Sequence, residues 1–121
     1  MILIVDDNTL NRMILMKLIR RMGLHGYTAT NGAEAVDFVR KKDDIELVLM
    51  DIMMPVMNGL DATLKIREFK KIEELPIVAV TADSTEGIKE KLEKAGCNDF
   101  VAKPIRKEII ENIIKKYIVV S

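Results

Sequence analysis

The sequence predicts an α/β fold, a doubly wound (βα)5 sandwich with helices on both faces of a parallel sheet. Short apolar or β-branched runs alternate along the chain with longer amphipathic segments. The runs are apolar throughout, so both faces of the sheet must be covered. Five such units fill the 121 residues, whereas a closed barrel of eight units needs about twice this length. We therefore expect a single domain over residues 1–121. Doubly wound sheets of five strands commonly have the order 2-1-3-4-5, and we expect that order here.

Strands are expected at five short runs: ILIV at 2–5, GYTAT at 26–30, ELVLM at 46–50, PIVAV at 76–80 and DFVA at 99–102. Segments of helical period lie between and after them, at Thr9–Met22, Ala33–Lys41, Gly59–Lys70, Ser84–Lys94 and Lys107–Tyr117. Each strand is thus followed by a helix, which is the pattern of a parallel sheet.

The apolar positions of these segments predict which helix faces are buried. In the first helix the expected stripe is Leu10, Ile14, Leu18 and Met22, with Met13, Leu15 and Ile19 beside it. Arg12, Lys17 and Arg21 are expected mainly on the other face, and Gly23 follows as a stop. The last helix repeats isoleucine at helical spacing, and Asp83 with Glu86 predicts a capping box for the fourth.

Composition excludes several classes of protein. The 19 basic side chains balance 19 acidic ones, so no overall positive field favours nucleic acid or anionic lipid. The single Cys97 forms no internal disulfide, and the N-terminus lacks the pattern of a secretory leader. The apolar run Met1–Val5 is too short to span a bilayer. We expect a soluble, cytoplasmic protein with no membrane insertion.

Polar residues interrupt the apolar strands at one edge of the predicted sheet. Asp6 and Asp7 end the first strand, Asp51 ends the third, Thr81 ends the fourth and Lys103 follows the fifth. The carboxyl ends of parallel strands share one edge, and ligands bind there where the strand order reverses. In the order 2-1-3-4-5 the first and third strands are neighbours, so the three carboxylates are expected to converge.

This group of residues predicts metal and phosphoryl chemistry. Carboxylates about 4 Å apart repel by roughly 4 kcal/mol at an effective dielectric near 20, so a cation is expected among them. Oxygen ligands without nearby His or Cys favour Mg²⁺, which leaves coordination positions for water and a phosphate. Lys103 and Thr81 suit phosphoryl oxygens, and a carboxylate beside Mg²⁺ is a nucleophile that can form an acyl phosphate.

With these residues in the order LIVDDN, VLMDIMMPVMNGLDA, VAVTA and FVAKP, essentially the whole chain resembles the receiver domain of two-component response regulators, of flavodoxin-like fold. The resemblance implies that Asp51 accepts a phosphoryl group from a histidine on a sensor histidine kinase or a histidine phosphotransfer protein. It also implies that Asp6, Asp7, Asp51 and the backbone carbonyl of Met53 bind Mg²⁺. The start DDNTLNR is similar to receivers of hybrid kinases and phosphorelays.

The same resemblance implies roles for residues on the fourth and fifth strands. Lys103 and Thr81 would contact the phosphoryl oxygens, with Ala82 kept small to admit the group. Thr81 and Phe100 would form the switch that repacks helix four, strand five and helix five, and the peptide between Lys103 and Pro104 would be cis. Such a domain is not a classical enzyme, but supports Mg²⁺-dependent autophosphorylation and slow self-dephosphorylation. Phe100 has a simpler interpretation as a core residue.

Three alternatives fit the sequence less well. A flavodoxin-like FMN binder needs a Ser/Thr/Gly-rich phosphate loop where this chain has two acids. A phosphohydrolase of the haloacid dehalogenase type needs an Asp-x-Asp pair, but Ile52 and Met53 follow Asp51. A degenerate receiver that serves only as an interaction module needs none of the acids, Thr81 or Lys103. As a receiver, the chain is either a stand-alone protein or a domain of a longer kinase.

Overall fold

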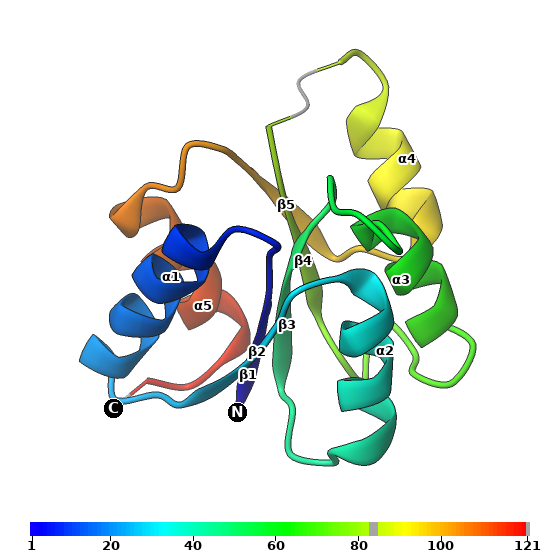
Figure 1. Ribbon diagram of the computed structural model, residues 1–121. Helices are drawn as coiled ribbons and strands as arrows, with labels where there is room; N and C mark the ends of the chain where they lie inside the picture. Colours follow the sequence, from blue (N-terminus) through cyan, green and yellow to red (C-terminus); the bar gives the residue numbers. More distant parts are fainter. Residues whose placement is uncertain (83–84, 121) are drawn as a thin grey trace.

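The computed structural model describes residues 1–82 and 85–120, and it has the predicted doubly wound architecture. The strands are β1 (Ile2–Val5), β2 (Gly26–Ala29), β3 (Leu47–Asp51), β4 (Ile77–Thr81) and β5 (Asp99–Ala102). The helices are α1 (Thr9–Arg21), α2 (Gly32–Lys41), α3 (Gly59–Ile66), α4 (Ile88–Ala95) and α5 (Lys107–Tyr117). The strands pair in parallel in the order β2-β1-β3-β4-β5, which confirms the prediction (Figure 1).

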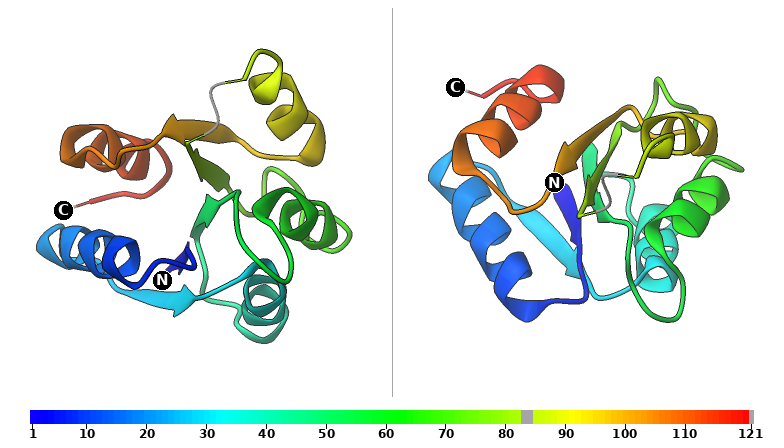
Figure 2. Two further views of the ribbon diagram at one scale, coloured as in Figure 1. Left: turned by 45° about the horizontal axis from the view of Figure 1, so that its top comes forward. Right: turned by 90° about the horizontal axis from the view of Figure 1, so that it is seen from above.

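Two helical layers cover the sheet, with α1 and α5 on one face and α2, α3 and α4 on the other (Figure 2). Each layer has its own core. Leu15 and Ile19 of α1 pack with Ile110 and Ile114 of α5 over one face. On the other face, Val36 and Val39 of α2 pack with Ala62 and Ile66 of α3 and Leu92 of α4. The three central strands, β1, β3 and β4, are buried between these cores because their side chains alternate between the two faces.

The register aligns the carboxyl ends of the central strands. Val5 of β1 lies opposite Met50 of β3, and Asp51 lies opposite Val80 of β4. The residue after β1 and the last residue of β3 therefore arrive at the same level, at the top of Figure 1. The fold alone brings the predicted site residues to one edge. Within the described part of the chain, no helix has the length and apolar character that a bilayer crossing needs.

The predicted stripe on α1 is partly wrong. Leu15, Leu18 and Ile19 are buried as expected, but Leu10, Met13 and Ile14 are 63%, 63% and 44% exposed. The helix packs on the sheet and on α5 along its Leu15–Ile19 side, and its first turn lies at the level of the strand ends (Figure 1). The helix itself is present as predicted, but which of its apolar residues face the core depends on the rotation of the helix.

The bounds of two other helices also differ from prediction. Helix α3 ends at Ile66 instead of Lys70, because the chain continues in tight turns closed by bonds such as that from the Phe69 N–H to the Ile66 carbonyl at 3.1 Å. Helix α4 begins at Ile88, since Gly87 has a left-handed φ of 88° that a helix cannot contain. The predicted start at Ser84 and the capping box of Asp83 lie outside the described residues.

Candidate functional site

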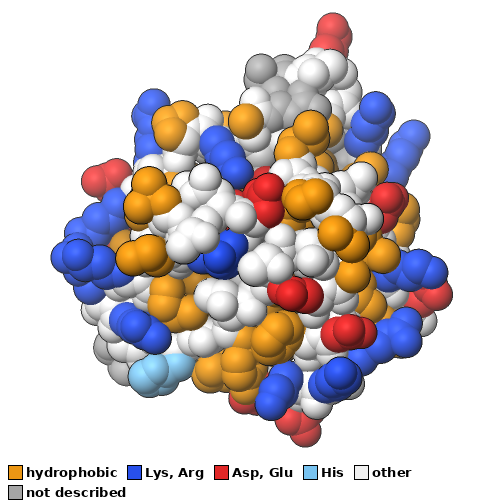
Figure 3. Space-filling view, in the orientation of Figure 1, with side chains coloured by type: hydrophobic (Ala, Val, Ile, Leu, Met, Phe, Trp, Pro, Cys, Tyr) orange, Lys and Arg blue, Asp and Glu red, His pale blue; other side chains and the backbone are white. Residues whose placement is uncertain are grey.

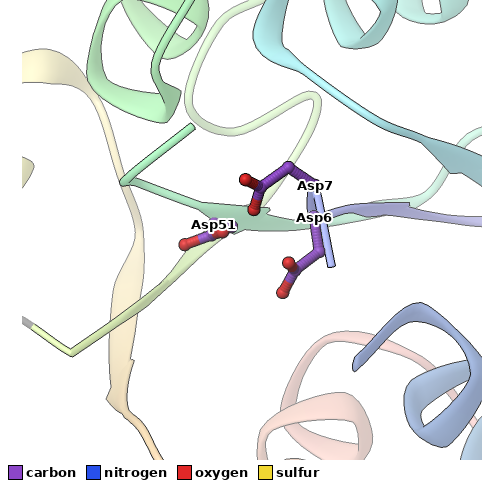
Figure 4. Close-up of side chains that lie close together, drawn as sticks. All are labelled: Asp6, Asp7 and Asp51. Carbon is purple, nitrogen blue, oxygen red and sulfur yellow. The ribbon is translucent and has the colours of Figure 1, made fainter. Parts of the chain in front are cut away.

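Three carboxylates meet at the carboxyl edge of β1 and β3. One oxygen of each of Asp6, Asp7 and Asp51 lies within 4.8 Å of the others. Figure 4 shows the three side chains close together at this edge. Asp6 and Asp51 are almost completely buried, with 1% and 2% of their surface exposed, and Asp7 is exposed. The sequence prediction of a convergent acidic cluster is therefore confirmed. Two buried negative charges at this distance are costly without a cation.

Asp51 is held at one oxygen only. Its Oδ1 lies 3.3 Å from the Lys103 ammonium and accepts a hydrogen bond from the Met53 N–H at 3.3 Å. Its Oδ2 is buried and has no hydrogen-bond partner among the described residues. Burial, and then the nearby Asp6 charge, raise the pKa of Asp51 to about 6, although Lys103 and the Met53 N–H oppose this shift. Such an oxygen, buried, charged and unpaired, requires an explanation outside the protein's own hydrogen bonds.

Lys103 supplies the positive charge at this edge. Its ammonium lies 3.3 Å from Asp51 Oδ1 and 3.6 Å from Asp6 Oδ2, and the side chain is 22% exposed. The Lys103 N–H donates to the Thr81 carbonyl at 2.8 Å, which fixes the start of the loop after β5. The peptide between Lys103 and Pro104 is cis, as expected. One ammonium between two carboxylates leaves a net negative site.

The predicted residues of β4 and β5 lie at two levels. Thr81 is completely buried at the end of β4, and Ala82 follows it as an exposed residue at the same edge. Phe100 lies two residues below the end of β5, opposite Ala79. The ring is half-buried and packs on the core that α2, α3 and α4 cover. The structure thus brings Thr81 and Ala82 to the acidic edge and places Phe100 below that edge, where it lines a small pocket with Leu92 of α4.

The loop after Asp51 contains a tight turn at Val56 and a close approach of the backbone at Gly59. Val56 has a positive φ of 67°, and the Met57 N–H donates to the Pro55 carbonyl at 2.8 Å, so the chain turns sharply there. A side chain at Gly59 would meet the Asp51 carbonyl oxygen at 2.2 Å, which only glycine avoids. The loop therefore returns directly beside Asp51.

Two residues that contact Asp6 were not identified from the sequence. The Asn11 side-chain amide donates to Asp6 Oδ2 at 3.3 Å, and Arg12 donates to the Asp6 carbonyl at 2.7 Å. Arg12 was expected mainly on the outer face of α1, but it is half-buried and turns back toward β1. In the sequence, these contacts are indicated only by two polar residues, Asn11 and Arg12, that follow the acids by one to two helical turns. Such pairs are common on exposed helix faces, so the pattern does not predict a contact.

The side chains at this edge suit the binding of a hard cation and a phosphoryl group. All the acidic ligands are oxygens, one of them is unpaired, and an ammonium and a hydroxyl-bearing strand end lie beside them. Mg²⁺ favours few carboxylate ligands with positions left for water and phosphate oxygens. The residues present therefore fit a magnesium ion with a phosphoryl group.

The model of the response regulator receiver domain family matches residues 2–115. The chain is 40% identical over 114 residues to two-component response regulator 24 of Arabidopsis thaliana, covering 94% of this chain and 81% of that protein. It is 36% identical over 123 residues to hybrid signal transduction histidine kinase I of Dictyostelium discoideum, covering 97% of this chain. The match spans only 7% of that kinase.

Solved structures that are similar over 96% of the chain include two with informative partners or ligands. One is the complex of the Saccharomyces cerevisiae histidine phosphotransfer protein Ypd1 with the receiver domain of Ssk1, with a TM-score of 0.89, 32% identity and 86% of that chain covered. The other is the receiver domain of sensor histidine kinase PA1611 from Pseudomonas aeruginosa, with a TM-score of 0.85, 31% identity and 94% of that chain covered. The latter structure has a magnesium ion in its active site cleft.

Proposed function

The chain belongs to the response regulator receiver domain family, and on that premise we propose that residues 1–121 form one receiver domain whose phosphoacceptor is Asp51. The observation that carries this proposal is the buried Asp51 Oδ2, which has no partner among the described residues. Asp6 is equally buried, but both of its carboxylate oxygens accept hydrogen bonds. Of the two buried carboxylates, Asp51 is therefore the one with an oxygen available to react.

The reaction is a phosphoryl transfer from a phosphohistidine of a sensor histidine kinase or a histidine phosphotransfer protein. A carboxylate oxygen of Asp51 attacks the phosphorus, a P–O bond forms, and the P–N bond breaks with its electron pair returning to the imidazole. The product is an acyl phosphate, which water hydrolyses slowly to inorganic phosphate and the free carboxylate. The domain is a phosphoacceptor that supports this chemistry, not an enzyme that turns over a substrate.

Asp6, Asp7, Asp51 and the Met53 backbone carbonyl would hold Mg²⁺ at this edge. When bound, the ion neutralises negative charge on the carboxylates and on the incoming phosphoryl group. Lys103 is positioned to contact a phosphoryl oxygen, because its ammonium already lies 3.3 Å from the reacting carboxylate. Thr81 offers a hydroxyl from the next strand, and the small Ala82 leaves room for the group.

Phosphorylation would be read out through Thr81 and Phe100. The Thr81 hydroxyl moves toward the phosphoryl group, the Phe100 ring turns inward, and the face formed by α4, β5 and α5 repacks. The position of Phe100 on the strand next to β4, lining a pocket with Leu92 of α4, supports this coupling. The inward state is favoured by the extra contacts that the phosphoryl group supplies. Thr81→Ala should still accept phosphate but lose most of this response.

The phosphodonor must reach Asp51 from the carboxyl edge, and α1 begins two residues after Asp7. Leu10, Met13 and Ile14 are exposed there, and Lys17 and Arg21 lie on the same helix. Figure 3 shows hydrophobic and basic side chains side by side over α1, at the left. A groove lined by Ile14, Lys17 and Ile105 continues this surface to the loop after β5. The exposed apolar residues support a protein partner as the donor.

Labelling with phosphoramidate and Mg²⁺, followed by intact-mass measurement, tests the phosphoacceptor. The wild type should gain one phosphoryl group, and neither Asp51→Asn nor wild type in EDTA should gain any. The exposed Asp37 of α2 provides a matched control, since Asp37→Asn should label normally. Labelling of Asp51→Asn at the wild-type rate would refute the assignment.

The switch is tested separately with beryllofluoride, which mimics the phosphoryl group. Amide shifts of α4, β5 and α5 should change in the wild type and change much less in Thr81→Ala. An equal response of the two proteins over residues 85–117 would show that Thr81 does not transmit the signal.

A further inference from the structure

Asp6 is held by the protein at every polar atom. Its N–H donates to the Ala29 carbonyl at 3.1 Å, and its carbonyl accepts from Arg12 at 2.7 Å. Its Oδ1 accepts from the Asn8 N–H at 2.9 Å, and its Oδ2 accepts from the Asn11 side chain at 3.3 Å. Asp51, the other buried acid of the cluster, has an oxygen without such a partner among the described residues. Asp6 is therefore held in a fixed orientation by the protein itself. Two residues of α1, Asn11 and Arg12, contribute to this.

Asn11 and Arg12 fix different parts of Asp6. Asn11 acts on the carboxylate, and Arg12 acts on the backbone, with its second guanidinium nitrogen bound to the Thr9 hydroxyl at 3.1 Å. Because Thr9 is the first residue of α1, the two bonds of Arg12 together connect the start of the helix to Asp6, the residue after β1. Neither contact is needed to cap the helix, since Asn8 already accepts the Asn11 N–H.

The Asn11 amide and the Lys103 ammonium both approach the same oxygen, Oδ2 of Asp6. The ammonium lies 3.6 Å from Asp6 Oδ2 and 3.3 Å from Asp51 Oδ1. A donated hydrogen bond stabilises the Asp6 carboxylate and reduces its demand for the ammonium. Without Asn11, Oδ2 of Asp6 would depend on Lys103 alone among the described residues. Lys103 would then move toward Asp6 and away from the reacting carboxylate.

We infer that Asn11 is a positioning residue of the phosphoryl-transfer site, assisted by Arg12. Asn11 orients the Asp6 carboxylate toward the cation site and leaves Lys103 available to Asp51. This inference rests on the proposed function, in which Asp6 helps to hold Mg²⁺ and Lys103 contacts the phosphoryl group. Partners that orient a metal ligand typically contribute about 10–100-fold to metal affinity or activity.

Asn11→Leu tests the inference, because leucine keeps approximate size and favours a helix but donates no hydrogen bond. The matched control is Asn112→Leu, the same change at an exposed position of α5. Calorimetric titration with Mg²⁺ should show roughly tenfold weaker binding for Asn11→Leu and unchanged binding for the control. At saturating Mg²⁺, labelling by phosphoramidate should also be slower in Asn11→Leu only. Arg12→Met should weaken Mg²⁺ binding less, since it leaves the carboxylate bond intact.

A measurement on the metal-free protein separates positioning from general stability. The Asn11 side-chain amide signal in the NMR spectrum should shift in Asp6→Asn. Asn11→Leu loses one hydrogen bond to a buried carboxylate and should melt at a lower temperature in EDTA, but it should stay fully folded at the temperature of the titrations. Asn11→Ala, which cannot clash, replaces Asn11→Leu if the latter fails to fold. Wild-type Mg²⁺ affinity and labelling rate in the folded variant would overturn the inference while leaving Asp51 as phosphoacceptor. Absence of labelling in the wild type would instead refute the proposed function.

Discussion

Charged groups at the two edges of the sheet differ in how completely they are hydrogen-bonded within the protein. At the amino edge, Arg67 at the end of α3 is half-buried, and its guanidinium donates to the carbonyls of Gly96, Lys70 and Lys71 and to Asn98 Oδ1, at 2.8 to 3.3 Å. At the carboxyl edge, Asp51 has one oxygen bonded and the other buried without a partner in the described chain. The first arrangement joins two loops, and the second leaves capacity for a ligand.

The carboxylates of Asp99 and Asp51 show the same difference between the two edges. Asp99 starts β5 at the amino edge and accepts hydrogen bonds from Lys116 and Tyr117 of α5. Burial alone would raise the pKa of Asp99, but these two bonds lower it below its usual value. At Asp51, burial and the neighbouring Asp6 prevail, and the pKa rises to about 6. A carboxylate satisfied within the protein stabilises the fold, whereas an unsatisfied one is poised to bind or react.

The largest expected effect on stability is at Lys103. Lys103→Met removes the ammonium shared by two buried carboxylates, and breaking a buried ion pair costs about 3 kcal/mol or more. We expect that loss in the free energy of unfolding, measured with urea in EDTA at pH 8. Because Mg²⁺ can replace the lost charge, saturating Mg²⁺ should restore most of it. The exposed Lys94 gives the control Lys94→Met, which should change little.

A smaller loss, without rescue by the metal, is expected at the amino edge. Arg67→Met removes the donor to the Gly96 and Lys70 carbonyl oxygens and should cost about 2–3 kcal/mol of unfolding free energy. Labelling of Asp51 should be unchanged, since Arg67 lies at the opposite edge. Arg21→Met, at an exposed position, is the control. If Mg²⁺ restored the stability of Arg67→Met, the proposed division between the edges would be wrong.

The pH dependence of the metal-free protein should follow Asp51. The folded-state pKa of about 6 lies above the usual 3.8, so the folded protein binds more protons between these values. The contribution of Asp51 to the free energy of unfolding therefore falls as pH rises from about 4 to 6, by about 2–3 kcal/mol. Denaturant melts in EDTA, compared between wild type and Asp51→Asn, measure this contribution. A difference that does not vary with pH would contradict the raised pKa.

The smallest effect is expected at Asp99, whose side chain is 27% exposed and whose partner Lys116 is 60% exposed. Asp99→Asn should cost about 0.5–1 kcal/mol at pH 7, because solvent screens the pair. The sign is opposite to that at Asp51. Since the folded pKa is lowered, the contribution is present above the unfolded pKa and is lost as pH falls through the folded pKa. A wild-type minus Asp99→Asn difference that grows on acidification would contradict this interpretation.

The sequence by itself determined the fold class and the residues of the acidic edge. Apolar strands such as LVLM need cover on both faces, and polar residues are tolerated only where such a strand ends. Asp6, Asp51, Thr81 and Lys103 were located by that rule alone, without knowledge of any contact. The rule is strong because a parallel sheet brings every carboxyl end to one edge.

Only the tertiary structure decided the rotation of α1 and the hydrogen-bond partners of each acid. Leu10 and Ile14 have the spacing of core residues, yet the packing of α1 on α5 leaves them exposed. Asn11 looks like an ordinary helix-surface residue until the turn after β1 brings it to Asp6. Periodicity fixes which residues share a helix face but not which face meets the sheet, because that depends on contacts between residues far apart in sequence. The unpaired oxygen of Asp51 is likewise a property of all its neighbours together, and no single stretch of sequence contains it.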